Sequence, residues 1–196
     1  MHQPNDPLFG ENIIADESID PTPYWFDDPY DHCIPRHYCR WSDAAFAELR
    51  NDEDIDLGHI GKPEDEGEYT VYPVGTIFEI VGELGTVSES DELYLIGKTL
   101  GWVTGEVVDD CARADVIVTP YINVCTVKVQ MTGGHTTAGG DSGGPWVKFD
   151  TGNDVELAGI HTGADASYRY FSAIGFIYLE LGPSSTWNSC IPAEGC

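Results

Sequence analysis

One serine in this chain lies in a turn that could make it a nucleophile. Residues 139–146 read Gly-Gly-Asp-Ser-Gly-Gly-Pro-Trp, so glycines flank Asp141 and Ser142 on both sides. A serine hydroxyl becomes a useful nucleophile only on a tight, rigid turn, beside a general base and a pair of backbone N–H donors. Glycines let the backbone reach the dihedral angles of such a turn. The alternative is an ordinary glycine-rich surface turn that carries a serine by chance.

Residues 140–145 resemble the nucleophile loop of the chymotrypsin-like serine proteases. The resemblance implies that Ser142 is the nucleophile and that the N–H groups of Gly140 and Ser142 form the oxyanion hole. It also implies an all-β fold of two six-stranded antiparallel Greek-key barrels with a short C-terminal helix. The matching sequence extends over about residues 41–181.

A second match, to bacterial members of this family, lies around Asp43. A short disulfide loop there precedes Ser-Asp-Ala-Ala, and the resemblance gives Asp43 the role of the carboxylate that orients the catalytic imidazole. The small and apolar residues that follow are compatible with a buried carboxylate. In the alternative interpretation, Ser42 and Asp43 begin a helix, because an Ala-Ala-Phe-Ala run follows them.

No histidine of this sequence matches the catalytic histidine of the family, which lies on an early strand in a small-residue segment ending in His-Cys. His32 precedes Cys33, but it follows an acidic turn and lies too close to Asp43 for the strands that usually intervene. His2 has even less support. We therefore expect a chain that begins after this histidine, with Met1 an internal methionine and with an incomplete first barrel that leaves sheet edges exposed.

Residues around the nucleophile predict the preferred substrate side chain. In this family they line the specificity pocket, and Thr136, at its base, replaces the aspartate expected of a trypsin. Thr137 and His161 are similar to a pair in glutamyl endopeptidases, whose hydroxyl and imidazole can hydrogen-bond a carboxylate. Thr162 and Gly163 complete the predicted substrate-binding residues. The resemblance favours Glu above Asp before the scissile bond; alternatively, His161 is satisfied by a neighbouring residue and Thr137 only packs.

The six cysteines fall in close pairs. An even number at short spacings is typical of disulfides formed in an oxidising compartment, so we expect a secreted protein, although residues 1–6 lack the features of a signal peptide. Zinc is the weaker alternative, because no Cys-x-x-Cys spacing is present. Other connectivities stay open, but nearest neighbours give the predicted pairs Cys33–Cys39, Cys111–Cys125 and Cys190–Cys196.

The net charge of −25, from 34 acidic and 9 basic residues, restricts the possible partners. Nucleic-acid binding needs a cationic surface, so we expect no nucleic-acid partner. The charge also repels self-association, so we expect a monomer. It fits either a high-salt source or simply an acidic secreted protein.

No apolar run approaches the ~18 residues of a membrane-spanning helix, so we expect no membrane partner. The acidic clusters at residues 51–54 and 64–66 lack the alternating ligands and central glycine of a calcium loop. A solvated face is the favoured interpretation of both clusters. We therefore expect neither a metal nor a cofactor.

Runs of β-branched and aromatic residues predict strands from residue 69 onward. They recur at intervals of about 8–12 residues, which is typical of a sandwich or barrel. Residues 1–40 are rich in Pro, Asp, Asn and Gly and predict loops, and residues 171–181 predict a closing helix. The predicted strands are residues 69–72, 76–81, 93–96, 102–108, 116–119 and 124–129, then a hairpin of 146–149 with 156–163.

We thus expect one trypsin-like peptidase domain over residues 1–196. Its parts would be a partial first barrel with acidic loops (about 1–90), a second barrel with the nucleophile (about 91–182) and a disulfide-closed tail (183–196). The expected function is hydrolysis of peptide or protein substrates through an acyl-enzyme on Ser142. The alternative is an inactive, protease-like binding protein, because no catalytic histidine is identifiable. A β-sandwich with a coincidental loop is disfavoured by the matches around Asp43 and His161.

Overall fold

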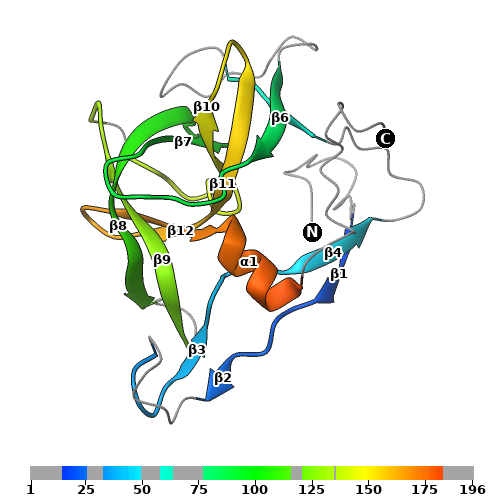
Figure 1. Ribbon diagram of the computed structural model, residues 1–196, viewed down its shortest axis with the longest axis vertical. Coiled ribbons are helices and arrows are strands. Elements are labelled where there is room, and N and C mark those ends of the chain that lie inside the picture. Colours follow the sequence, from blue (N-terminus) through cyan, green and yellow to red (C-terminus); the bar gives the residue numbers. More distant parts are fainter. Residues whose placement is uncertain are drawn as a thin grey trace.

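The structure, a computed structural model, describes residues 15–25, 33–49, 58–63, 77–115, 121–134 and 136–182. Within these ranges it consists of strands and one short helix (Figure 1). The elements are β1 (Ala15–Ile19), β2 (Tyr24–Trp25), β3 (Tyr38–Arg40), β4 (Phe46–Leu49), β5 (His59–Gly61), β6 (Ile77–Glu83), β7 (Glu92–Gly97), β8 (Gly101–Asp115), β9 (Tyr121–Met131), β10 (Pro145–Phe149), β11 (Asp154–Ala164), β12 (Arg169–Ala173) and α1 (Ile174–Leu181).

Six of these strands close a barrel in which every neighbouring pair is antiparallel. The order around the barrel is β7, β8, β9, β12, β11, β10 and back to β7. Alternate residues of the strands point inward, as the two-residue period of a strand requires. The buried core comprises Val87, Leu93, Leu95, Val103, Val107, Val127, Val129, Trp146, Ala158 and Phe171.

Outside the barrel, two of its strands, β11 and β9, each pair with one further strand. β6 pairs with β11 in parallel and β5 with β6, while β3 pairs with β9 in parallel and β2 with β3. β1 and β4 form a separate two-stranded sheet. Among the described residues these strands form no second closed barrel. The predicted all-β fold with a short C-terminal helix is confirmed.

Two of the predicted elements are wrong. Residues 1–40 include three strands, β1 to β3, rather than loops alone, and β3 lies within the sheet because it pairs with β9, about eighty positions further along the chain. Residues 171–173 belong to β12 rather than to the helix, because Phe171 pairs with His161 and closes the barrel. The helix therefore begins only at Ile174. The predicted strands at 69–72 and 116–119 lie outside the described residues.

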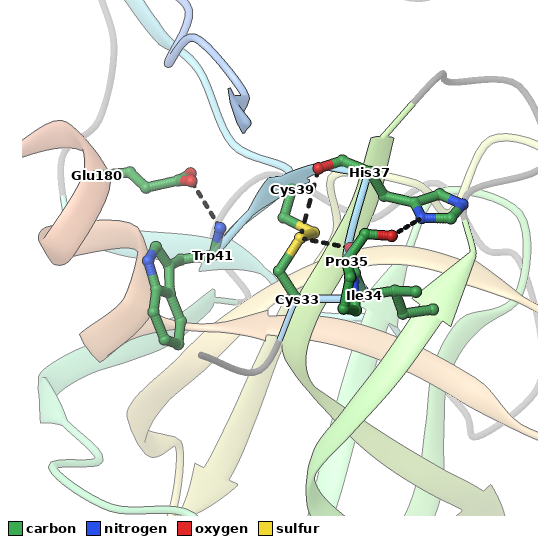
Figure 2. The surroundings of a disulfide bond; sticks show 7 residues. All are labelled: Cys33, Ile34, Pro35, His37, Cys39, Trp41 and Glu180. Atoms are coloured by element: carbon green, nitrogen blue, oxygen red, sulfur yellow. Dashed lines mark hydrogen bonds between the residues drawn. A yellow bond between two sulfur atoms is a disulfide. The ribbon is translucent and has the colours of Figure 1, made fainter. Parts of the chain in front are cut away.

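Two of the three predicted disulfides are confirmed. The Cys33–Cys39 bond closes the loop before β3 (Figure 2). The Cys33 Sγ lies 3.6 Å from the carbonyl oxygens of Ile34 and His37. The Cys111–Cys125 bond links β8 to β9. The predicted Cys190–Cys196 pair lies outside the described residues.

The helix α1 packs beside the barrel and over the segment that follows β3. Ile174 and Ile177 form a buried cluster with Ala44, and Trp41 stacks on Phe176 with ring centroids 5.5 Å apart. α1 therefore fixes the position of the chain around Asp43. In the part of the chain described, no helix has the length and apolar composition to span a membrane.

Two glycines of β11 test how closely β11 and β12 approach each other. A Cβ at Gly159 would lie 2.1 Å from the Ser172 carbonyl oxygen, whereas a Cβ at Gly163 would meet nothing within 4 Å. We expect Gly159→Ala to lower the free energy of unfolding by about 1–3 kcal/mol, as overpacking does. Gly163→Ala is the matched control and should change it by less than about 1 kcal/mol. Urea denaturation measures both, and equal effects would contradict the close contact at Gly159.

Candidate active site

The loop that carries Ser142 has a conformation that depends on glycine. Gly140 and Gly143 have φ angles of 107° and 82°, in the region that residues with a Cβ rarely adopt. A Cβ at Gly140 would also lie 2.8 Å from the Thr99 hydroxyl oxygen. The side chain of Ser142 is exposed between these two glycines. The turn therefore presents the hydroxyl to solvent on a constrained backbone.

A buried carboxylate holds this loop in place. Asp141 is 1% exposed, and its Oδ1 and Oδ2 accept hydrogen bonds from the N–H groups of Thr99 (2.8 Å) and Ala138 (2.9 Å). A Cβ at Gly97 would lie 2.4 Å from Oδ1, so only glycine leaves room for the carboxylate there. Asp141 thus ties the nucleophile loop to the turn between β7 and β8.

The backbone N–H groups of the loop divide into two sets. Those of Asp141, Gly143 and Gly144 donate to the carbonyls of Ala138 (3.2 Å), His161 (2.9 Å) and Asp141 (3.0 Å). Those of Gly140 and Ser142 have no partner among the described residues, and both residues are exposed. These are the two N–H groups predicted to form the oxyanion hole. They are free to donate to an oxygen that gains negative charge.

Asp43 lies between β3 and β4 and is held from two sides. Its N–H donates to the Ser172 hydroxyl (2.8 Å), and its Oδ1 accepts from the Tyr121 hydroxyl (3.2 Å). Burial, and then the negative charge of Asp43, raise the pKa of Tyr121, so the phenol stays protonated and can donate. The alternative in which Asp43 begins a helix is wrong, because the residues after it form β4.

The anchors of Asp43 and of the Ser142 loop lie on one strand pair. Ser172 of β12 pairs with Ile160 of β11, and the next residue of β11 is His161, whose carbonyl accepts from Gly143. The hydrogen-bonded strands β11 and β12 therefore connect the two predicted catalytic residues.

Buried polar contacts also fix the segment around Asp43. Glu180 of α1 accepts hydrogen bonds from the N–H groups of Trp41 (2.6 Å) and Ser42 (3.1 Å) and from the Ser42 hydroxyl (2.7 Å); Figure 2 shows the bond to Trp41. Arg40, which is 4% exposed, donates to the carbonyl of Ala44 (2.9 Å). The backbone on both sides of Asp43 is therefore held by charged groups, whose hydrogen bonds are stronger than neutral ones.

The described histidines do not supply a general base. They are His37, His59 and His161, and none hydrogen-bonds the Ser142 hydroxyl or the Asp43 carboxylate. The other histidines, His2, His32 and His135, lie outside the described residues. Within the described part of the chain, the site thus contains a constrained serine and an anchored carboxylate without an imidazole between them.

His161 is a buried residue of β11 that lies next to the core residue Trp146. It is 4% exposed, and its Nδ1 accepts from the indole N–H of Trp146 at 3.4 Å. Burial lowers the pKa of His161 to about 4; the charge of Arg169 adds to this shift, and that of Asp141 opposes it. The imidazole is therefore neutral at neutral pH. It can take part in hydrogen bonds but carries no charge.

Two of the other predicted substrate-binding residues, Thr136 and Thr162, hydrogen-bond to residues of β12. Thr136 is exposed and Thr137 half-buried, and the Thr162 hydroxyl donates to the carbonyl of Tyr170 (3.1 Å). The sequence analysis missed Arg169, whose guanidinium donates to the Thr136 hydroxyl. The sequence feature that could have indicated this residue is its position as the one basic residue in the aromatic run 168–171 of a strongly acidic chain. Among the described residues, no cluster of three or more His, Cys, Asp or Glu side chains could hold a metal.

No family model and no curated protein matches the chain. Several solved bacterial serine proteases resemble it in structure. They include the Cellulomonas bogoriensis chymotrypsin (16% identity, 70% of this chain and 66% of that one, TM-score 0.52) and Thermobifida fusca protease A (15%, 70% and 64%, 0.53). A further match is a glutamic-acid-specific serine protease that uses a histidine triad in substrate binding (16%, 72% and 66%, 0.54).

The chain has the fold of the chymotrypsin-like serine proteases. At these sequence identities the likeness establishes the fold alone. The chain spans about two thirds of the length of the solved structures it matches, 64–66% in these three.

Replacing Asp141 tests whether its carboxylate holds the loop. Asparagine offers one acceptor oxygen instead of two, so Asp141→Asn leaves one buried N–H, of Thr99 or Ala138, facing an amide NH2. We expect the free energy of unfolding to fall by about 1–3 kcal/mol. The matched control, Asp150→Asn, changes an exposed carboxylate and should stay within about 0.5 kcal/mol of the wild type. Equal effects of the two substitutions in urea denaturation would show that the Asp141 carboxylate does not hold the loop.

The pKa of His161 predicts a loss of stability in acid. The unfolded chain protonates His161 near pH 6.5, whereas the folded chain does so only near pH 4. Falling pH therefore favours the unfolded state across this window. Between pH 7 and pH 4 we expect the wild type to lose about 2–3 kcal/mol more than a His161→Gln variant. Denaturant titrations at each pH measure the difference, and parallel pH profiles would refute it.

Proposed function

We propose that this protein is a serine endopeptidase that hydrolyses peptide or protein substrates through an acyl-enzyme on Ser142. The observation that carries the proposal is the state of the nucleophile loop. Ser142 is exposed on a turn locked by Asp141, and the two N–H groups beside it, of Gly140 and Ser142, are left unpaired among the described residues. An ordinary surface turn needs neither the buried carboxylate nor this division of donors.

In the proposed reaction, a general base takes the Ser142 hydroxyl proton while Oγ bonds to the substrate carbonyl carbon. The carbonyl oxygen becomes an oxyanion that accepts from the N–H groups of Gly140 and Ser142. The C–N bond then breaks, and the amine leaves with the proton that the base had taken. In the second half of the reaction, the base takes a proton from water while the water oxygen bonds to the acyl carbon. The bond from this carbon to Ser142 Oγ then breaks, and Oγ takes the proton from the base, which releases the acid and restores Ser142.

We place the general base, an imidazole, outside the described residues. Asp43 would orient it, because one carboxylate oxygen, Oδ2, has no partner among the described residues while Oδ1 is held by Tyr121. A carboxylate fixed in this way can accept the second imidazole N–H and keep the ring in the required tautomer.

We also propose a preference for Glu, and then Asp, before the scissile bond. The glutamic-acid-specific structural neighbour supports it, as do the positions of Thr136, Thr137 and His161 near the nucleophile loop. We expect the whole chain to act as one secreted peptidase domain; the two disulfides support an oxidising compartment.

The second candidate function is binding without cleavage. It is favoured by one observation, that no described histidine contacts Ser142. Without its base, a triad enzyme keeps only a small residual activity, about 10³–10⁴-fold over water. Such a protein would hold peptides at the same residues but release them uncut.

Covalent labelling separates the two candidates. A fluorophosphonate probe reacts with an activated serine, so we expect the wild-type protein to be labelled at Ser142 and the Ser142→Ala variant to stay unlabelled. Ser88→Ala, which removes an exposed serine, is the control and should label fully. Gel fluorescence and peptide mass spectrometry provide the measurement. If the folded wild type is not labelled, the binding function replaces the enzymatic one.

A further inference from the structure

Arg169 is a buried cation that has no negatively charged partner among the described residues. It is 5% exposed on β12, and its hydrogen bonds to described residues all go to neutral acceptors. Nη1 donates to the carbonyls of Asp165 (2.9 Å) and Tyr168 (2.8 Å), and Nη2 donates to the Thr136 hydroxyl. Its Nε–H, which is also buried, has no partner among the described residues. A buried charge normally has an opposite charge beside it, because its desolvation is costly.

The nearby carboxylates are committed elsewhere. The Asp165 side chain accepts from the N–H groups of Ser167 and Tyr168 (both 2.7 Å) and from the Tyr170 hydroxyl (2.8 Å). The Asp141 side chain accepts from two backbone N–H groups, those of Thr99 and Ala138. In a chain with 34 acidic residues, no described carboxylate forms an ion pair with Arg169. The cation is therefore available to an anion from outside the chain.

Arg169 also lies beside two of the predicted substrate-binding residues, Thr136 and His161. Its Nη2 contacts Thr136, which is exposed and belongs to the segment leading to Ser142. A Cβ would meet nothing within 4 Å at Gly139, which belongs to this segment, or at Gly163, which pairs with Tyr170 next to Arg169. The positive charge of Arg169 also lowers the pKa of His161, another of the residues predicted to bind the substrate side chain.

We propose that Arg169 is the specificity-determining residue that binds the side-chain carboxylate of the substrate residue before the scissile bond. This inference rests on the proposed function, because it assigns a role at the same site. The carboxylate accepts from Nη2 and from the Nε–H on the same edge of the guanidinium, the side-on geometry in which arginine pairs with carboxylates. Thr136 is exposed, so its hydroxyl can turn and donate to the same carboxylate.

The division of roles between Arg169 and His161 follows from their charges. A neutral His161 can contribute a hydrogen bond but cannot neutralise a carboxylate. An arginine guanidinium carries the positive charge that this requires. The positive charge of the site therefore comes from Arg169.

A binding experiment tests this role without needing catalysis. Two N-acetylated tetrapeptides that differ only in a C-terminal Glu or Gln are titrated into the whole protein by calorimetry. Both carry the same α-carboxylate, so the ratio of their Kd values isolates the side-chain charge. We expect the wild type to bind the Glu peptide about 10- to 100-fold more tightly. In Arg169→Met the ratio should fall to about 1, and in the control Arg113→Met, which removes an exposed arginine of β8, it should not change.

A wild-type ratio near 1, or a preference that persists in Arg169→Met, would overturn the inference. Near-UV circular dichroism checks that each variant is folded. If Arg169→Met does not fold, Arg169→Lys decides, since it keeps the charge but loses the planar pair of donors. We expect its ratio to fall at least about threefold below the wild type; an unchanged ratio would count against Arg169.

The fluorophosphonate probe separates failure of this inference from failure of the proposed function. A protein that is not labelled at Ser142 but keeps the Arg169-dependent preference would bind acidic peptides without cutting them, and the inference would stand. A protein that is labelled but has a Kd ratio near 1 would be a serine enzyme whose specificity lies elsewhere.

Discussion

The geometry of the candidate active site depends on one buried carboxylate, that of Asp141. Its two oxygens hold two backbone N–H groups, of Thr99 and Ala138, and thereby fix the turn on which Ser142 is exposed. Glycine is needed on both sides of this contact: Gly97 leaves room for the carboxylate, and Gly140 adopts a φ of 107°. The conformation of the loop therefore depends on the interaction of one carboxylate with backbone N–H dipoles and on glycine at two positions, rather than on apolar packing.

The closed barrel links the Ser142 loop to the other residues of the candidate site. β11 accepts the Gly143 N–H through His161, and its neighbour β12 holds Asp43 through Ser172. The same strand β12 carries Arg169 next to the predicted substrate-binding residues. The proposed nucleophile, orienting carboxylate and specificity residue therefore depend on one pair of antiparallel strands, so a substitution that separates these strands should affect all three.

Local signals made part of this structure predictable. The turn that carries Ser142, five of the six strands of the closed barrel and two disulfides follow from glycine placement, residue periodicity and short cysteine spacing. β3 could not be predicted in the same way, because its pairing with distant β9 is a tertiary contact in a segment whose composition favours loops. Phe171 was assigned to a helix because barrel closure, which places it in a strand, leaves no local pattern. Arg169 was not among the predicted site residues, because its proposed role follows from the lack of a negatively charged partner among the described residues, which the sequence does not show.

The most direct test of the central claim is a crystal structure of the protein treated with a peptidyl phosphonate that carries a glutamate side chain. The account predicts a covalent bond between phosphorus and the Ser142 Oγ. It also predicts that the phosphonyl oxygen lies about 2.7–3.1 Å from the backbone nitrogens of Gly140 and Ser142. An adduct whose oxygen accepts from neither N–H, or a folded protein whose Ser142 stays unmodified, would contradict the assignment of this loop as a catalytic one.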